Sequence, residues 1–185
     1  GMPMRLYALR HGETSWNVQR RFQGQSDIPL NDKGILLAEL TGEGLANIPF
    51  DLAFTSPLCR ARQTAELVLA GRDVPLYVEP RLIEMAFGVY EGVTANSGPG
   101  GTLNQNLVDF ICHAERYQAP EHGGAITAML NAIDPPEGFF WRGGVPYNCS
   151  YSIIDVGEDR VPVLVAENQI CYPLEQTKSS ALRLD

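Results

Sequence analysis

The chain has 185 residues, a formal net charge of −8 and 44% hydrophobic residues, which indicates one globular domain and argues against a disordered chain. The acidic balance argues against sequence-independent nucleic-acid binding, and the apolar runs stop well short of the ~20 residues that span a bilayer. Four scattered cysteines without a CxxC pair predict neither a zinc site nor a disulfide framework, and no secretory signal is visible. We therefore expect a cytoplasmic protein with one domain over residues 1–185, in which Gly1 is a tag-cleavage scar and 174–185 a polar tail.

The first half of the chain alternates short apolar runs with helical patterns. Strands are expected at residues 5–9, 51–55 and 75–79. One helix is expected after Asn31 and Asp32, which offer an N-cap. A second helix begins with Ser56 as its N-cap and Pro57 as its first helical residue, and it runs through residue 69. This order predicts an α/β fold, a three-layer sandwich with a mostly parallel central sheet and helices on both faces.

The second half of the chain is less regular. Expected here are a loop over residues 94–102, helices over 103–111 and 126–133, and a last strand over 161–166. Apolar and polar residues alternate over 147–153, which predicts a strand whose polar side faces solvent. That polar side carries Asn148, Ser150 and Ser152.

Polar side chains follow two of the predicted strands at the points where these strands end. Arg10 and His11 come after the first strand, and Ser56 comes after the second, with Arg60 and Arg62 one turn into the next helix. Because ligands bind at the carboxyl ends of parallel strands, an imidazole, guanidinium groups and the free N–H groups of a helix would meet at one edge. Such a pocket binds a phosphoryl group, with His11 as the nucleophile. The alternative is that the arginines are solvated and His11 is an ordinary hydrogen-bonded residue at a strand end.

Four blocks of sequence follow one another in a distinctive order. They are LRHGETSWN at 9–17 with FQGQSDIPLNDKG at 22–34, TSPLCRARQTA at 55–65, RLIEMAFGVYEG at 81–92 and HGGAI at 122–126. An RHG triplet alone is a weak signal, but four ordered blocks are specific. Together they resemble the histidine phosphatase superfamily, in its phosphoglycerate mutase-like branch.

The resemblance implies a covalent mechanism that uses neither a metal nor another cofactor. His11 would attack the phosphorus and carry the phosphoryl group, and Glu84 would protonate the leaving alkoxide and then activate water. His122 would complete the catalytic set by binding the equatorial oxygens together with Arg10 and Arg60. The further residues that the motifs place at the phosphate or the substrate entrance are Asn17, Gln23, Gly24 and Gly123.

The sequence before His122 departs from the family pattern. The family delivers this histidine from a hydrophobic central strand, whereas residues 114–121 are polar and include Pro120, so they cannot form a central parallel strand. A helix and a strand are therefore expected to be missing between Glu121 and His122. Either this segment is absent from the sequence or the chain carries a true deletion, and the match of the flanking blocks favours the first. A true deletion would require another segment to fill the central strand position and would put activity in doubt.

The predicted activity is hydrolysis of a small phosphorylated metabolite. Phosphoglycerate mutases of the family carry a paired-arginine loop after the block that contains Glu84. No Arg-Arg pair follows residue 84 in this sequence, which favours a phosphatase over a mutase because a mutase must hold a second anionic group. A catalytically silent member that binds a phosphorylated ligand is the remaining alternative. An exposed edge strand could form a homodimer, while neither nucleic acid nor a membrane is an expected partner.

Overall fold

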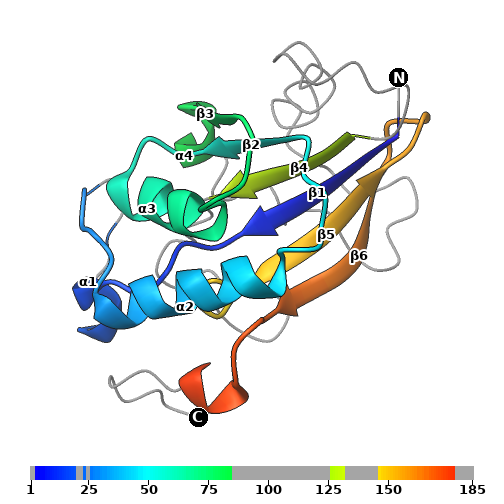
Figure 1. The fold of residues 1–185 in the computed structure, drawn as a ribbon. Helices are drawn as coiled ribbons and strands as arrows, with labels where there is room; N and C mark the ends of the chain where they lie inside the picture. The colour runs from blue at the N-terminus through cyan, green and yellow to red at the C-terminus, as the bar shows by residue number, and fades with distance from the viewer. Residues whose placement is uncertain (1–2, 20–22, 24–25, 85–125, 132–145, 178–185) are drawn as a thin grey trace.

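The computed structural model describes residues 3–19, 23, 26–84, 126–131 and 146–177, and Figure 1 shows a sheet with helices packed against it. In chain order the elements are β1 (Met4–Leu9), α1 (Ser15–Val18), α2 (Asp32–Gly44), β2 (Leu52–Thr55), α3 (Cys59–Val68), β3 (Leu76–Val78), α4 (Arg81–Glu84), β4 (Ile126–Asn131), β5 (Tyr151–Val156), β6 (Pro162–Gln169) and the 3-10 helix η3 (Leu174–Thr177). In this described part of the chain, no helix is long and apolar enough to cross a membrane.

The six strands form one sheet in the order β3-β2-β4-β1-β5-β6. β1 to β4 run parallel to one another, whereas β5 runs antiparallel to β1 and β6 antiparallel to β5. The connections through α2 and α3 place both helices on the same face of the sheet (Figure 1). The predicted α/β class with a mostly parallel central sheet is thus confirmed, as are the first three strands and the last one. The loop and helix expected over 94–111 lie outside the described residues.

The two long helices begin differently from each other. Asn31 caps α2 as expected, because its Oδ1 accepts a hydrogen bond from Gly34 N at 2.8 Å. The predicted start of the next helix at Ser56 and Pro57 is wrong, since α3 begins only at Cys59. Its first N–H groups are satisfied from outside the helix: Leu58 N donates to Ser56 Oγ, and Cys59 N donates to the carboxylate of Asp27 at 2.7 Å. These N–H groups are therefore not free to bind a ligand.

The helix predicted over residues 126–133 is also wrong, because residues 126–131 form β4. A short apolar run fits either a buried strand or a buried helix. Here it lies between β1 and β2 and pairs with both in parallel register, which buries it on both sides. β4 therefore fills the central strand position that the sequence before His122 leaves open.

The prediction that the polar residues around β5 face solvent is wrong, because these residues are buried. Ser152 is buried on the strand, and its hydroxyl accepts a hydrogen bond from Asn168 N at 3.2 Å. Asn148 and Ser150 precede the strand and are buried as well. The strand has two covered faces because its alternate side chains also pack against the core. The expected polar tail begins with η3, while 178–185 lie outside the described residues.

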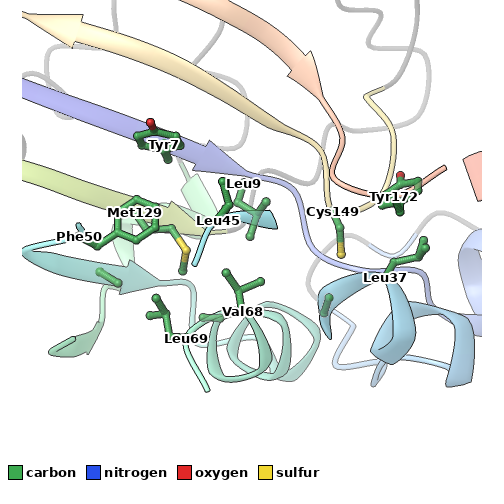
Figure 2. Packing of buried hydrophobic residues seen from close by; sticks show 13 residues of the cluster. Tyr7, Leu9, Leu37, Leu45, Phe50, Val68, Leu69, Met129, Cys149 and Tyr172 are labelled. Atoms are coloured by element: carbon green, nitrogen blue, oxygen red, sulfur yellow. The ribbon is translucent and has the colours of Figure 1, made fainter. Parts of the chain in front are cut away.

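The main hydrophobic core lies between the sheet and the helices α2 and α3 (Figure 2). It joins every layer of the described fold, and its buried members are Tyr7, Leu9, Leu37, Ala38, Leu45, Phe50, Ala53, Ala65, Val68, Leu69, Met129, Cys149 and Tyr172. The rings of Tyr7 of β1 and Phe50 form a T-shaped pair with 5.1 Å between their centroids, a favourable aromatic geometry. This packing fixes the central strands, and with them the residues that follow their carboxyl ends.

Candidate active site

Three neighbouring strands end together at one edge of the sheet. Asn131, the last residue of β4, pairs with Leu9 of β1 on one side and with Thr55 of β2 on the other. The residues that follow these ends, Arg10 and Ser56, therefore lie at the same edge, and Ser56 N donates to Asn131 O at 3.1 Å. This is the edge where open parallel sheets bind ligands. The sequence predicts Arg10 and Ser56 at this edge, whereas no motif points to Asn131.

His11 is completely buried, and one nitrogen of its ring is held by the backbone. Nδ1 lies 2.8 Å from the carbonyl oxygen of Gly12. Because a carbonyl oxygen can only accept, this contact puts the proton of the neutral ring on Nδ1 and leaves a lone pair on Nε2. The backbone of His11 is held too, since its carbonyl oxygen accepts from Cys149 N at 3.2 Å and from Asn148 Nδ2 at 3.3 Å. The arrangement suits a nucleophilic imidazole.

The turn after His11 packs directly against the start of α2. A Cβ at Gly12 would lie 2.8 Å from Gly34 O, and a Cβ at Gly34 would lie 2.2 Å from Glu13 O. The two backbones can approach this closely only without side chains. Asn31 adds two hydrogen bonds to the buried Glu13, from its backbone N at 2.9 Å and from its Nδ2 at 3.1 Å. Glu13 is thereby committed to a structural role beside the site.

Arg10 is buried and is positioned by a segment from the far end of the chain. Its Nη1 donates to Pro146 O at 2.5 Å, and its backbone N donates to Ser150 O at 2.9 Å. The same segment, 146–150, also supplies the two donors to the carbonyl of His11. The alternating pattern predicts a strand over 147–153, and it gives no sign of contact with Arg10, which is far from this segment along the chain.

Arg60 lies in the first turn of α3 and is completely buried. Its Nη1 donates to Ser26 O at 2.6 Å, and its own carbonyl accepts from the hydroxyl of Thr64 at 2.7 Å. Thr64 Oγ1 also accepts from Gly12 N at 2.9 Å, so Arg60 is tied to the turn that carries His11. Arg62, which the sequence placed at the same edge, is exposed.

Asn17 and Gln23 join the site through polar side chains. Asn17 Oδ1 accepts from Thr14 N at 3.0 Å and from Asn148 Nδ2 at 3.4 Å. Gln23 is buried, and its Oε1 accepts from Thr14 Oγ1 at 2.8 Å. Because the side-chain oxygen of each amide is engaged, the donor end is the part suited to an anionic ligand.

Glu84 is the last residue of α4, which follows β3 after a short connection. Glu79 fixes that connection: its backbone N donates to Thr55 O at 2.8 Å, and its carboxylate accepts from Arg81 N at 3.1 Å. Glu79 also forms a salt bridge with Arg81 at 2.7 Å. The helix that bears Glu84 is thereby attached to the end of β2.

The structure thus connects five of the predicted site residues, Arg10, His11, Asn17, Gln23 and Arg60, by the contacts given above. The other predicted residues, Gly24, His122 and Gly123, lie outside the described residues, as does the side chain of Glu84. Within the described part of the chain, no group of three or more His, Cys, Asp and Glu side chains is arranged to hold a metal ion.

A family model described as "Histidine phosphatase superfamily (branch 1)" matches residues 6–99 of the chain. This range contains most of β1, all of β2 and β3, both long helices and all five connected site residues. The match thus covers His11, Arg10 and Arg60, whereas Asn131 and the segment 146–150, which contribute to the same edge, lie outside it.

Curated relatives match over different lengths of the chain. The adenosylcobalamin/alpha-ribazole phosphatase of Escherichia coli is 42% identical over 186 aligned positions, covering 84% of this chain and 91% of that protein. The alignment uses 84% of the 185 residues of this chain, which is about 155 residues. Of the 186 aligned positions, about 186 − 155 = 31 therefore have no counterpart in this chain. The enzyme of the same name from Salmonella typhimurium is 49% identical over 88 residues, and the match spans 44% of its length. The chain thus spans less than half of some curated relatives that it matches.

Solved structures share the fold at lower identity. Bacillus stearothermophilus YhfR superposes with a TM-score of 0.62 at 24% identity, covering 90% of this chain and 98% of that protein. A mycobacterial glucosyl-3-phosphoglycerate phosphatase gives a TM-score of 0.65 at 22% identity, covering 89% of this chain and 99% of that protein. These likenesses establish the α/β architecture.

Proposed function

The chain belongs to the histidine phosphatase superfamily, and from this membership we propose that it hydrolyses a small phosphorylated metabolite through a phosphohistidine intermediate. The observation that carries the proposal is the buried His11 ring, whose Nδ1 donates to Gly12 O and whose Nε2 therefore keeps a lone pair. Two buried guanidinium groups, those of Arg10 and Arg60, belong to the same network.

In the first step, Nε2 of His11 attacks the phosphorus and the P–O ester bond breaks. The leaving oxygen takes a proton from Glu84, which the sequence motif matches to this role. In the second step, water attacks the phosphorus, gives its proton to Glu84 and displaces the ring nitrogen, so that inorganic phosphate is released. Charge spreads over the equatorial oxygens in both steps, and the guanidinium groups of Arg10 and Arg60 stabilise it without a metal.

The remaining matched residues have supporting roles in this proposal. The sequence motif alone assigns His122 and Gly123 to the phosphoryl pocket, because β4 begins at Ile126, which pairs with Met4 at the end of β1 away from His11. Asn17 and Gln23, whose amide oxygens are engaged by other side chains, offer N–H donors at the entrance beside Gly24.

The substrate class follows from the relatives. Those with the names adenosylcobalamin/alpha-ribazole phosphatase are 42% and 49% identical over their aligned regions, which favours a phosphomonoester on a ribose-like group as the first substrate to try. A mutase is the second candidate, because a phosphoglycerate mutase of Gloeobacter violaceus is 40% identical over 91 residues. The sequence after residue 84, which holds no Arg-Arg pair, supports the phosphatase.

The proposal includes a cytoplasmic location. In the described part of the chain, Cys59, Cys149 and Cys171 are all free thiols, which is typical of a reducing compartment. Homodimer formation through an edge strand stays a prediction, and the edge strands of the described sheet are β3 and β6.

The test is hydrolysis of p-nitrophenyl phosphate and of a ribose 5-phosphate monoester in excess chelator. We compare the parent with His11→Ala, and with His113→Ala as a control that removes a histidine outside the matched blocks. Turnover that resists the chelator, persists in His113→Ala and disappears in His11→Ala supports the proposal. Acid-labile phosphate bound to the parent and absent from His11→Ala identifies the intermediate.

Other outcomes separate the alternatives. Activity that survives in His11→Ala would contradict the assignment of the nucleophile. Transfer of phosphate between glycerate phosphates, with little hydrolysis, identifies a mutase. If the parent binds a phosphorylated ligand but hydrolyses none of these substrates, it is a catalytically silent binding protein. The aligned positions of the E. coli enzyme that have no counterpart in this chain would then explain the lost activity.

A further inference from the structure

Thr64 contacts both the turn that carries His11 and the carbonyl of Arg60. It lies on α3 and is completely buried. Its hydroxyl donates to Arg60 O at 2.7 Å and accepts from Gly12 N at 2.9 Å. A hydroxyl has one hydrogen, and a carbonyl oxygen can only accept, so the direction of both bonds is fixed.

The Gly12 backbone is the link between this hydroxyl and the His11 ring. Gly12 donates its N–H to Thr64 and accepts the Nδ1 proton of His11 at its carbonyl, at 2.8 Å. The N–H lies in the His11–Gly12 peptide and the carbonyl in the Gly12–Glu13 peptide, and the two peptides meet at the Gly12 Cα. Because a glycine has little rotational restraint of its own, the bond to Thr64 is one of the contacts that hold this turn in place. The carbonyl held in the turn selects the Nδ1–H form of the ring.

From these contacts we propose that Thr64 is a positioning residue, which holds Gly12 so that His11 presents an unprotonated Nε2 to the substrate. The inference rests on the proposed function in naming His11 as the nucleophile. It assigns Thr64 no contact with substrate. Without the hydroxyl, the buried Gly12 N–H has no acceptor there. The His11–Gly12 peptide, still held at the His11 carbonyl by Cys149 N and Asn148 Nδ2, is then expected to shift and to displace the Gly12 carbonyl.

Thr41 provides a matched control on the neighbouring helix α2. It is also completely buried, and its hydroxyl makes the same type of bond, to Leu37 O one turn earlier at 2.7 Å. Its other neighbour is the thiol of Cys149 and not the backbone of Gly12. Thr41→Val and Thr64→Val therefore remove the same group from equally buried helical positions.

The experiment combines kinetics with ¹⁵N NMR of the histidine rings, in which His11→Ala identifies the signals of His11. Thr64→Val is expected to lower kcat between about 10- and 100-fold with little change in KM, since small displacements of a reacting group have effects of this size. In the same variant the His11 signals move away from the Nδ1–H form. Thr64→Ser restores both readouts, and Thr41→Val changes neither.

Two results would overturn the inference. One is a Thr64→Val protein with the kcat and the His11 spectrum of the parent, and the other is a Thr41→Val protein that shows the same two changes. If Thr64→Val does not fold, Thr64→Ala provides the comparison with Thr64→Ser. If the parent hydrolyses nothing, the proposed function fails, but the His11 spectrum still tests the role of Thr64.

Discussion

The carboxylate of Asp27 caps the first turn of α3 by accepting a hydrogen bond from Cys59 N at 2.7 Å. The bond connects the loop before α2 to the helix that bears Arg60, and Ser26 in the same loop accepts from the Arg60 guanidinium. Because Cys59 N donates to the charged form, the bond lowers the pKa of Asp27 below its ordinary 3.8. The geometry of the site therefore depends on a carboxylate outside the set of predicted site residues.

Asp27→Ala is expected to lower the free energy of unfolding by about 1 kcal/mol at neutral pH, the usual effect of losing a cap. A lowered folded pKa means that the contribution is present above the ordinary value of 3.8 and is lost as the pH falls through the folded value. Urea unfolding of parent and variant at about pH 7 and about pH 2.5 measures the difference. Asp27→Asn keeps the hydrogen-bond acceptor, so its free energy of unfolding should match that of the parent at neutral pH. If Asp27→Ala differs from the parent by the same free energy at both pH values, the prediction is wrong.

Arg60 and Arg62 form a matched pair on α3, since Arg60 is completely buried and Arg62 is exposed. Arg60→Met is expected to lower kcat/KM by about 10²- to 10³-fold, the usual effect of removing one donor to a developing charge. Arg62→Met should stay close to the parent. Steady-state kinetics on an aryl phosphate measure both, with thermal unfolding as the check on folding. Equal losses in the two variants would remove Arg60 from the phosphoryl pocket.

Gly34→Ala tests the close approach of α2 to the turn after His11. The added Cβ would lie 2.2 Å from Glu13 O, so the backbones must separate, at a cost of about 1–3 kcal/mol in stability. Gly157→Ala is the control, because its Cβ would meet only Asp159 Oδ1 at an ordinary 3.4 Å. Denaturant unfolding should show a loss for Gly34→Ala and little change for Gly157→Ala. An unaltered midpoint in Gly34→Ala would mean that the two backbones are not in contact.

Cys149 makes stability depend on alkaline pH. Its thiol is buried in the core, and burial raises its pKa from 9.0 to about 12. Below about pH 9 the thiol is protonated in both the folded and the unfolded protein. Above about pH 9 the unfolded chain loses a proton that the folded protein keeps. The free energy of unfolding therefore falls as the pH rises toward 12. The loss is at most about 1.4 kcal/mol per pH unit. Cys149→Ala should show a shallower decline of Tm across this range, and parallel profiles for the two proteins would contradict the prediction.

The parts of the fold that were predictable are those set by local pattern. The first three strands and the Asn31 cap of α2 follow from short apolar runs and from one side chain near a helix start. Residues 126–131 carry no such decisive signal, because a short apolar run fits a strand or a helix until its neighbours are known. The positions of β1 and β2 on either side settle it as a strand.

The site was predictable where one motif holds several residues and not where distant segments meet. Arg10 and His11 are adjacent in the sequence, and the motif containing Arg60 is specific. The segment 146–150 contacts both Arg10 and His11 through backbone groups, and a backbone contact depends little on side-chain identity. The polar pattern around Ser152 misled for a related reason, since its partner is the backbone of Asn168.

During synthesis, β1 and β2 leave the ribosome long before β4, the strand that lies between them. Leu9 and Thr55 both pair with Asn131, so the two halves of the sheet cannot join until that part of the chain has emerged. Contacts between such distant residues form slowly because the long intervening loop must close first. In the interval, both strands expose unpaired apolar edges that can pair with other nascent chains. A chaperone that covers these edges until β4 has emerged should therefore increase the yield of folded protein.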